Sequence, residues 1–142
     1  MTDLVTDLVA FLSRDALTME DVAGFVGPVA DDPGVPLPAE LDPVLPGVRA
    51  ARVARYPDSG APYVLTIEPD AASPTTPRAL RSILGDYARP LTRREVPTAV
   101  VFAPSAGARW AIVVIARLAS RADDLDDVPI TSIAFRRDPV TP

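Results

Sequence analysis

The sequence predicts an α+β fold: an antiparallel sheet of about five strands with helices mainly on one face. Apolar residues repeat with helical period in some segments, and strand-length apolar runs come in pairs around turns that contain Pro and Gly. A helix followed by such a hairpin occurs twice, so we expect the element order α-αββ-αββ-β. We expect one domain over residues 1–142, made of an N-terminal helix (1–16), a first αββ unit (17–70) with a Pro-rich insertion (28–46), and a second αββ unit plus final strand (75–137).

The first expected helix spans residues 3–13. Leu4, Leu8 and Leu12 recur every four residues, which places them on one apolar stripe. Thr2 precedes this stripe and is expected to cap the helix. The stripe predicts a helix that packs on the core, with docking on a partner as the alternative.

Two further helices have clear start and stop signals. Thr18 and Asp21 have the spacing of a capping box, and Gly27 ends the helix that follows. Thr76 begins the last helix, with Pro77 at the favoured first position, and Gly85 ends it. The apolar stripes of these two helices are Met19, Val22, Phe25 and Val26, and Leu80, Ile83 and Leu84.

Five segments are expected as strands: 48–56, 63–68, 98–103, 110–118 and 130–136. The first is also compatible with a helix, because it is rich in Ala and its Arg residues recur every three positions. Residues 28–46 contain six prolines and are expected to be a connector without a regular helix or a central strand.

The two αββ units also match in sequence. Thr18–Gly27 aligns with Thr76–Gly85, and the turn Pro57–Tyr63 aligns with Pro104–Trp110 because both read P-x-x-G-A-x-aromatic. One unit alone leaves apolar surface exposed, so two units sharing a sheet would cover each other. Residues 112–115 are apolar on both strand faces, so the second face needs a cover. The options are the N-terminal helix, the Pro-rich connector or a second subunit, and we expect a homodimer.

Composition excludes much chemistry. The chain has no Cys, His, Lys, Asn or Gln, so it lacks thiol nucleophiles, imidazole bases and Schiff-base lysines, and we expect no cofactor and no metal. A net charge of −5 disfavours nucleic acid as the main partner. No apolar run has the ~20 residues of a membrane span, and no signal peptide is visible at the N-terminus. A cytoplasmic protein without membrane contact is therefore expected.

Carboxylates are the remaining candidates for chemistry. Glu68 and Asp70 lie two residues apart and could act as an acid–base pair, but a solvated strand end explains them as well. Residues 123–127 carry four Asp and could hold a hard cation, although the EF-hand spacing is absent and a solvated loop is the simpler interpretation. Arg136 and Arg137 are interpreted as a solvated pair.

Candidate binding residues are aromatic side chains that could anchor a ligand or partner and arginines that could contact anions. They are Tyr56, Tyr63, Tyr87 and Trp110, and Arg81, Arg93 and Arg94. Because the catalytic residue types are scarce, we expect a non-catalytic protein-interaction or accessory module of the immunity, inhibitor or chaperone-like kind. The alternative is a small-molecule-binding protein or compact enzyme, with an apolar pocket between sheet and helices that uses Tyr, Asp, Glu or Arg. An enclosed pocket there of roughly a few hundred Å³, lined by Tyr or Trp with one buried carboxylate or Arg, would favour this alternative, whereas a solid core would remove it.

Overall fold

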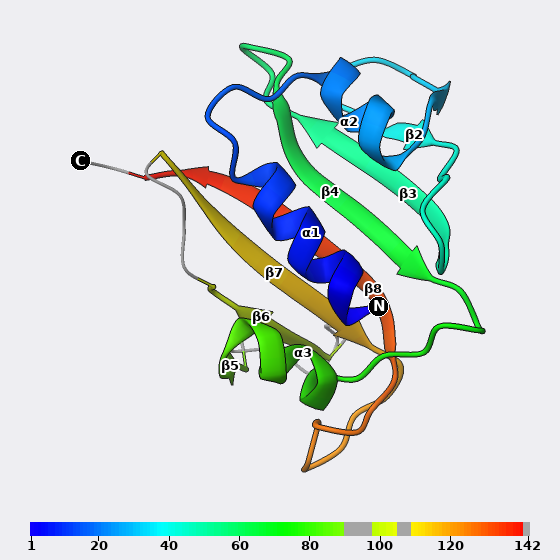
Figure 1. The fold of residues 1–142 in the computed structure, drawn as a ribbon, viewed down its shortest axis with the longest axis vertical. Helices are drawn as coiled ribbons and strands as arrows, with labels where there is room; N and C mark the ends of the chain where they lie inside the picture. Colours follow the sequence, from blue (N-terminus) through cyan, green and yellow to red (C-terminus); the bar gives the residue numbers. More distant parts are fainter. Residues whose placement is uncertain (90–97, 105–108, 141–142) are drawn as a thin grey trace.

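A computed structural model describes residues 1–89, 98–104 and 109–140. The helices are α1 (Thr2–Leu12), α2 (Met19–Val26) and α3 (Pro77–Leu84). The strands are β1 (Val29–Asp31), β2 (Ala39–Leu41), β3 (Val48–Arg55), β4 (Pro62–Pro69), β5 (Tyr87–Ala88), β6 (Ala99–Phe102), β7 (Trp110–Leu118) and β8 (Ile130–Pro139). Within the described residues, all eight strands form one antiparallel sheet in the order β1-β2-β3-β4-β8-β7-β6-β5 (Figure 1). The predicted sheet of about five strands is therefore wrong.

The strands that were not predicted from the sequence are short. β1 and β2 have three residues each and lie inside the Pro-rich segment, and β5 has two residues. Segments this short are below the length at which a two-residue period can be recognised. Residues 28–46 were expected to be a connector without a regular helix or a central strand. They contain β1 and β2, which pair at one edge of the sheet, where prolines are tolerated beside short strands. β2 pairs with β3, and its Ala39 and Leu41 are buried.

Residues 48–55 form a strand and not a helix. Their neighbours β2 and β4 pair with them on both sides. Ala51 and Val53 are buried, whereas Arg49 and Arg52 are exposed. The three-residue recurrence of Arg is thus a weaker signal than the alternation of buried and exposed positions along a paired strand.

The predicted αββ unit is also wrong, because each of the later helices leads into more strands than a hairpin. In the described part of the chain, α2 precedes β1–β4 and α3 precedes β5–β8, and the two groups of strands meet where β4 pairs with β8. The aligned turns are not equivalent: one joins β3 to β4, whereas the other lies between β6 and β7, with its residues 105–108 outside the described part. Pro and Gly suit many hairpin turns, so their recurrence did not identify equivalent positions.

Two of the three predicted helix caps are confirmed. The Thr18 hydroxyl accepts a hydrogen bond from the Asp21 amide at 3.1 Å, and the Asp21 carboxylate accepts one from the Thr18 amide at 3.0 Å. Thr76 caps α3 through its hydroxyl, with Pro77 at the first position. Thr2 is instead the first residue of α1, and the N-cap is Met1, without a side-chain cap. No helix in the described ranges is long and apolar enough to cross a membrane.

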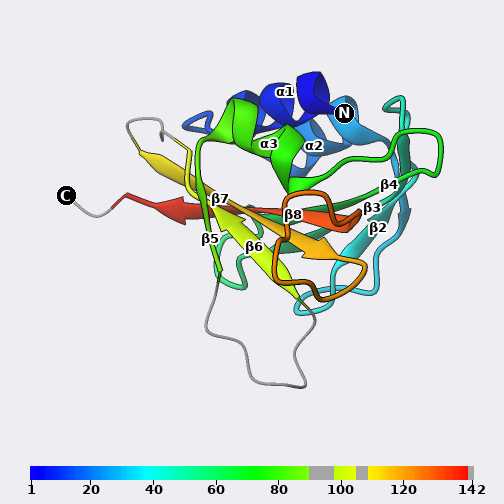
Figure 2. The ribbon, with the colours of Figure 1, turned by 90° about the horizontal axis from the view of Figure 1, so that it is seen from below.

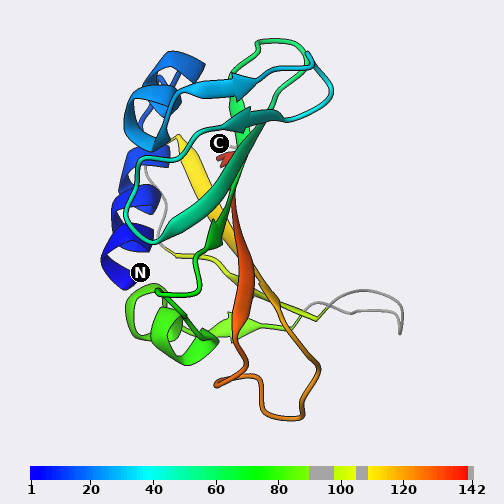
Figure 3. The same cartoon turned by 90° about the vertical axis from the view of Figure 1, so that its right-hand side faces the viewer.

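The core lies between the sheet and the helices, which sit on the same side of it (Figures 2 and 3). Ile112 and Val114 of β7 are buried in this core, whereas Val113 and Ile115 point to the other face and are half-buried. Neither of the covers expected from the chain itself lies on that other face: α1 packs on the core side, and the Pro-rich segment extends the sheet at its edge.

Gly24 inside α2 and Gly27 at its C-cap give a matched pair of substitutions. A Cβ at Gly24 would meet nothing within 4 Å, so Gly24→Ala should raise the free energy of unfolding by about 0.5–1 kcal/mol through helix propensity. A Cβ at Gly27 would lie 1.9 Å from the Asp42 carbonyl oxygen, at a φ of 152°, so Gly27→Ala should lower it by about 2 kcal/mol or more. Urea titration checks both; equal stability of the two variants would contradict the described α2 terminus.

Candidate functional site

A pocket of about 520 Å³ opens at one end of the sheet. The α1–α2 loop, the β3–β4 turn, the start of β7 and the end of β8 meet there, at the upper left of Figure 1. We call it the aromatic pocket. Its lining residues are Asp15, Ala16, Leu17, Thr18, Tyr56, Asp58, Ser59, Ala61, Trp110, Arg137 and Pro139.

Arg137 forms the buried end of the aromatic pocket. Arg137 is only 1% exposed, so the interpretation of Arg136 and Arg137 as a solvated pair is wrong for Arg137. The guanidinium donates from Nε to the Leu12 carbonyl at 2.8 Å, from Nη2 to the Arg14 carbonyl at 2.9 Å and from Nη1 to the Pro62 carbonyl at 3.3 Å. No carboxylate in the described part of the chain forms an ion pair with it, so the buried charge is balanced by carbonyl dipoles.

One of these carbonyls, that of Leu12, belongs to the last residue of α1. The last carbonyls of a helix lack partners within the helix, and the negative end of its dipole favours a cation. α1 has no basic residue in its last turn, and Arg137 reaches it from β8. Burial lowers the pKa of Arg137, but an arginine side chain remains charged at neutral pH.

The Trp110 ring packs on this guanidinium, Tyr56 lies near Trp110, and Tyr63 contacts Tyr56. The Arg137 guanidinium carbon is 4.0 Å from the Trp110 ring centroid, and the Trp110 indole N–H donates to the Asp15 carbonyl at 3.0 Å. The Tyr56 hydroxyl donates to the Arg137 carbonyl. The Tyr56 ring centroid lies 6.3 Å from that of Trp110 and 4.6 Å from that of Tyr63. The structure thus brings together the predicted residues Tyr56, Tyr63 and Trp110.

The chemistry of the aromatic pocket suits binding. Burial is the main cause that raises the pKa of Tyr56, so its hydroxyl stays protonated at neutral pH and acts as a hydrogen-bond donor. The Thr18 hydroxyl already caps α2. The Arg137 guanidinium is directed at backbone carbonyls. These groups fix the walls of the pocket, and none of them is positioned to exchange a proton near pH 7.

The predicted residues Arg81 and Tyr87 belong to a different group, which we call the acid–arginine cluster. It consists of Arg78, Arg81, Tyr87, Asp126 and Asp127. Asp126 accepts from the Arg81 guanidinium at 2.8 Å and from the Tyr87 hydroxyl at 2.5 Å, and Asp127 pairs with Arg78 at 2.9 Å. These contacts hold the loop before β8 against α3. The interpretation of residues 123–127 as a solvated loop is therefore wrong for Asp126, whose side chain is 14% exposed.

The remaining acidic candidates have local partners. Glu68 pairs with Arg49 at 2.8 Å, and Asp70 accepts a hydrogen bond from the Ala72 amide at 3.0 Å. In residues 1–89, 98–104 and 109–140, no three potential metal ligands come together. Arg93 and Arg94 lie outside the described residues.

Arg137 is the residue that sequence reasoning missed. A signal for it exists: Ile133, Phe135 and Arg137 alternate along β8, and all three are buried. Continuing the inward face of the strand by one more position would have placed the arginine in the interior.

Comparison with known proteins gives no match. No protein-family model matches the chain, and neither a curated protein nor a solved structure is significantly similar to it. The site is therefore interpreted from its own geometry.

Arg137→Ala should lower the free energy of unfolding by about 2–4 kcal/mol, because it leaves buried carbonyl groups without donors. The control is Arg117→Ala, at an exposed position of β7, which should change stability by less than about 0.5 kcal/mol. Denaturant unfolding followed by circular dichroism measures both; equal effects would contradict the role assigned to Arg137.

The acid–arginine cluster predicts a loss of stability in acid. The hydrogen bond from the Tyr87 hydroxyl, and after it the neighbouring arginines, hold the pKa of Asp126 below its usual 3.8. The hydrogen bond from Arg78 likewise lowers the pKa of Asp127. Stability from a lowered carboxyl pKa is fully present above the unfolded value and is lost as the pH falls through the folded value. Asp126→Asn should therefore lose stability near pH 6 and show a smaller further loss between pH 5 and pH 2, within the range expected for carboxyl titration. Unchanged acid sensitivity in this variant would contradict the assignment.

Proposed function

We propose that the protein is a non-catalytic interaction module that binds a segment of a partner protein in the aromatic pocket. The observation that carries the proposal is a pocket of about 520 Å³ with Tyr56 and Trp110 in its walls and a buried arginine behind them. Aromatic side chains at the centre of an interface contribute much of the binding energy. An open pocket at the end of a sheet accepts one side chain or short segment of a larger molecule.

The walls of the aromatic pocket are held before any partner binds. Trp110 is fixed by its indole hydrogen bond to Asp15 and by the Arg137 guanidinium, and Tyr56 is fixed by its hydroxyl. Side chains that are already ordered lose little conformational entropy on binding. This supports a binding role for the pocket.

A second candidate, binding of a small molecule, is favoured by the volume and by the Tyr, Trp and Arg lining. The region between sheet and helices, where such a site was expected, is occupied by buried side chains such as Leu8, Phe102 and Phe135. The pocket lies instead at the end of the sheet, open to solvent. We therefore prefer a protein segment as the occupant.

A substitution that fills the aromatic pocket tests the proposed function. Ala16 is exposed and lines the pocket, so Ala16→Phe should block it without removing a hydrogen bond that holds its walls. Ala122→Phe is the matched control, because Ala122 is exposed in the loop before β8, at the opposite end of β7 and β8 (Figure 1). In affinity purification from the native host, wild type and control should retain a stoichiometric partner that Ala16→Phe loses. Equal retention by the blocked variant, or no partner with wild type, would contradict the proposal.

We also keep the homodimer as a proposal. Val64, Val113 and Ile115 lie half-buried on the sheet face away from the helices, with Arg136 between Val64 and Val113, and a second copy would cover these apolar side chains. Light scattering should give twice the mass of one chain, and Ile115→Arg should return it to the mass of one chain. A single-chain mass for wild type at all protein concentrations would exclude the dimer.

A further inference from the structure

We infer that the occupant of the aromatic pocket is a protein segment that presents an arginine or lysine side chain beside apolar residues. This inference rests on the proposed function, because it names the chemistry of the partner at the same pocket. It follows from the charges at the mouth of the pocket, the hydrogen bonds that occupy Arg137, and the Tyr56 ring in the lining.

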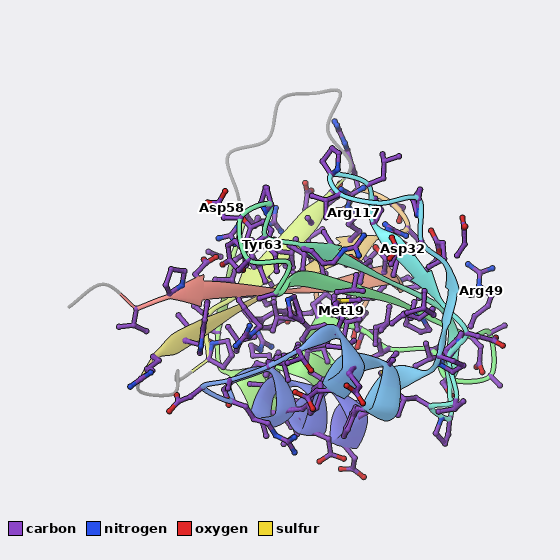
Figure 4. All side chains as sticks on the ribbon, turned by 90° about the horizontal axis from the view of Figure 1, so that it is seen from above. Met19, Asp32, Arg49, Asp58, Tyr63 and Arg117 are labelled. Carbon is purple, nitrogen blue, oxygen red and sulfur yellow. The ribbon has the colours of Figure 1, made fainter. Side chains whose placement is uncertain are left out.

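Two exposed carboxylates belong to the lining, Asp15 and Asp58. Asp58 lies on the β3–β4 turn at the outer end of the sheet (Figure 4), and its side chain makes no hydrogen bond or ion pair within the described ranges. The Asp15 carboxylate is 4.0 Å from the Arg109 guanidinium, and both side chains are more than half exposed. Solvent weakens such a pair almost completely, so both carboxylates are available to a cation.

Arg137 in the lining does not make the pocket favour an anion over a cation. Arg137 directs three N–H groups at backbone carbonyls and is almost completely buried. An anionic ligand would first meet the carboxylates at the mouth, on a chain whose net charge is −5. A cationic ligand is instead attracted both at long range and at the mouth.

The other lining groups suit the rest of an arginine or lysine side chain. The Tyr56 ring lies in the lining beside Asp58, and aromatic faces attract ammonium and guanidinium groups. Leu17, Ala61 and Pro139 provide apolar wall against which an aliphatic stem can pack. A segment with a cation between apolar residues would therefore match both parts of the pocket.

Capped tripeptides test this inference directly. The first has arginine between two leucines; the second replaces arginine with citrulline, which has the same shape without the charge, and the third replaces it with glutamate. Arginine amide alone represents a small cation. Trp110 is the single tryptophan of the chain, so its indole N–H resonance and its fluorescence report binding in the pocket.

The arginine peptide should shift the Trp110 signal and bind roughly threefold to tenfold more tightly than the citrulline peptide, and its affinity should fall as salt is raised. The double variant Asp15→Asn with Asp58→Asn should remove that difference, whereas Asp42→Asn, at another exposed carboxylate, should keep it. Equal or tighter binding of the citrulline or glutamate peptide overturns the inference and leaves the proposed function standing. Arginine amide binding as tightly as the peptide overturns it in favour of a small cation. The absence of a Trp110 shift with every peptide also overturns the inference. The proposed function is then decided separately, by the affinity purification that compares wild type with Ala16→Phe.

Discussion

The buried guanidinium of Arg137 is the constraint on which the pocket end of the molecule depends. Two of its three carbonyl partners, Leu12 and Arg14, lie at and just after the end of α1, and the third, Pro62, lies far along the sequence at the start of β4. A charge in the interior is tolerated only where dipoles or counter-charges surround it, so these segments must stay in place around the arginine. The same side chain packs on Trp110, and its own carbonyl accepts the Tyr56 hydroxyl. One residue therefore sets the positions of both aromatic walls.

Under the proposed function, the groups that stabilise the pocket end of the molecule also shape the surface offered to a partner. The groups that would make a pocket reactive are used to build it: the arginine is directed at carbonyls, the tyrosine hydroxyl at a carbonyl, and the Thr18 hydroxyl at the amide of α2. What remains for a partner is the aromatic and aliphatic surface and the exposed carboxylates at the mouth. Such a surface would discriminate by shape and charge, as the proposed interaction module requires.

The sequence predicted the local elements well and their assembly poorly. Thr18 and Thr76 marked helix starts because capping is a local hydrogen bond between residues three apart. The five longer strands correspond to predicted segments, whereas β1, β2 and β5 are too short to show a period, and pairing with longer neighbours creates them. Tyr56, Tyr63 and Trp110 were selected for their residue type, but their proximity depends on β3, β4 and β7 meeting at one end of the sheet. Arg137 was missed because an arginine was assumed to be solvated, although its position on β8 faces the interior.

The most direct test of this account is the exchange of the Arg137 Nε–H with solvent, measured by nitrogen-15 NMR. The hydrogen bond to the Leu12 carbonyl and the burial of the side chain predict exchange far slower than for the exposed Arg52 and Arg117. A rate for Arg137 equal to those of the exposed arginines would show that its guanidinium is solvated. The proposed support for the aromatic pocket would then be absent.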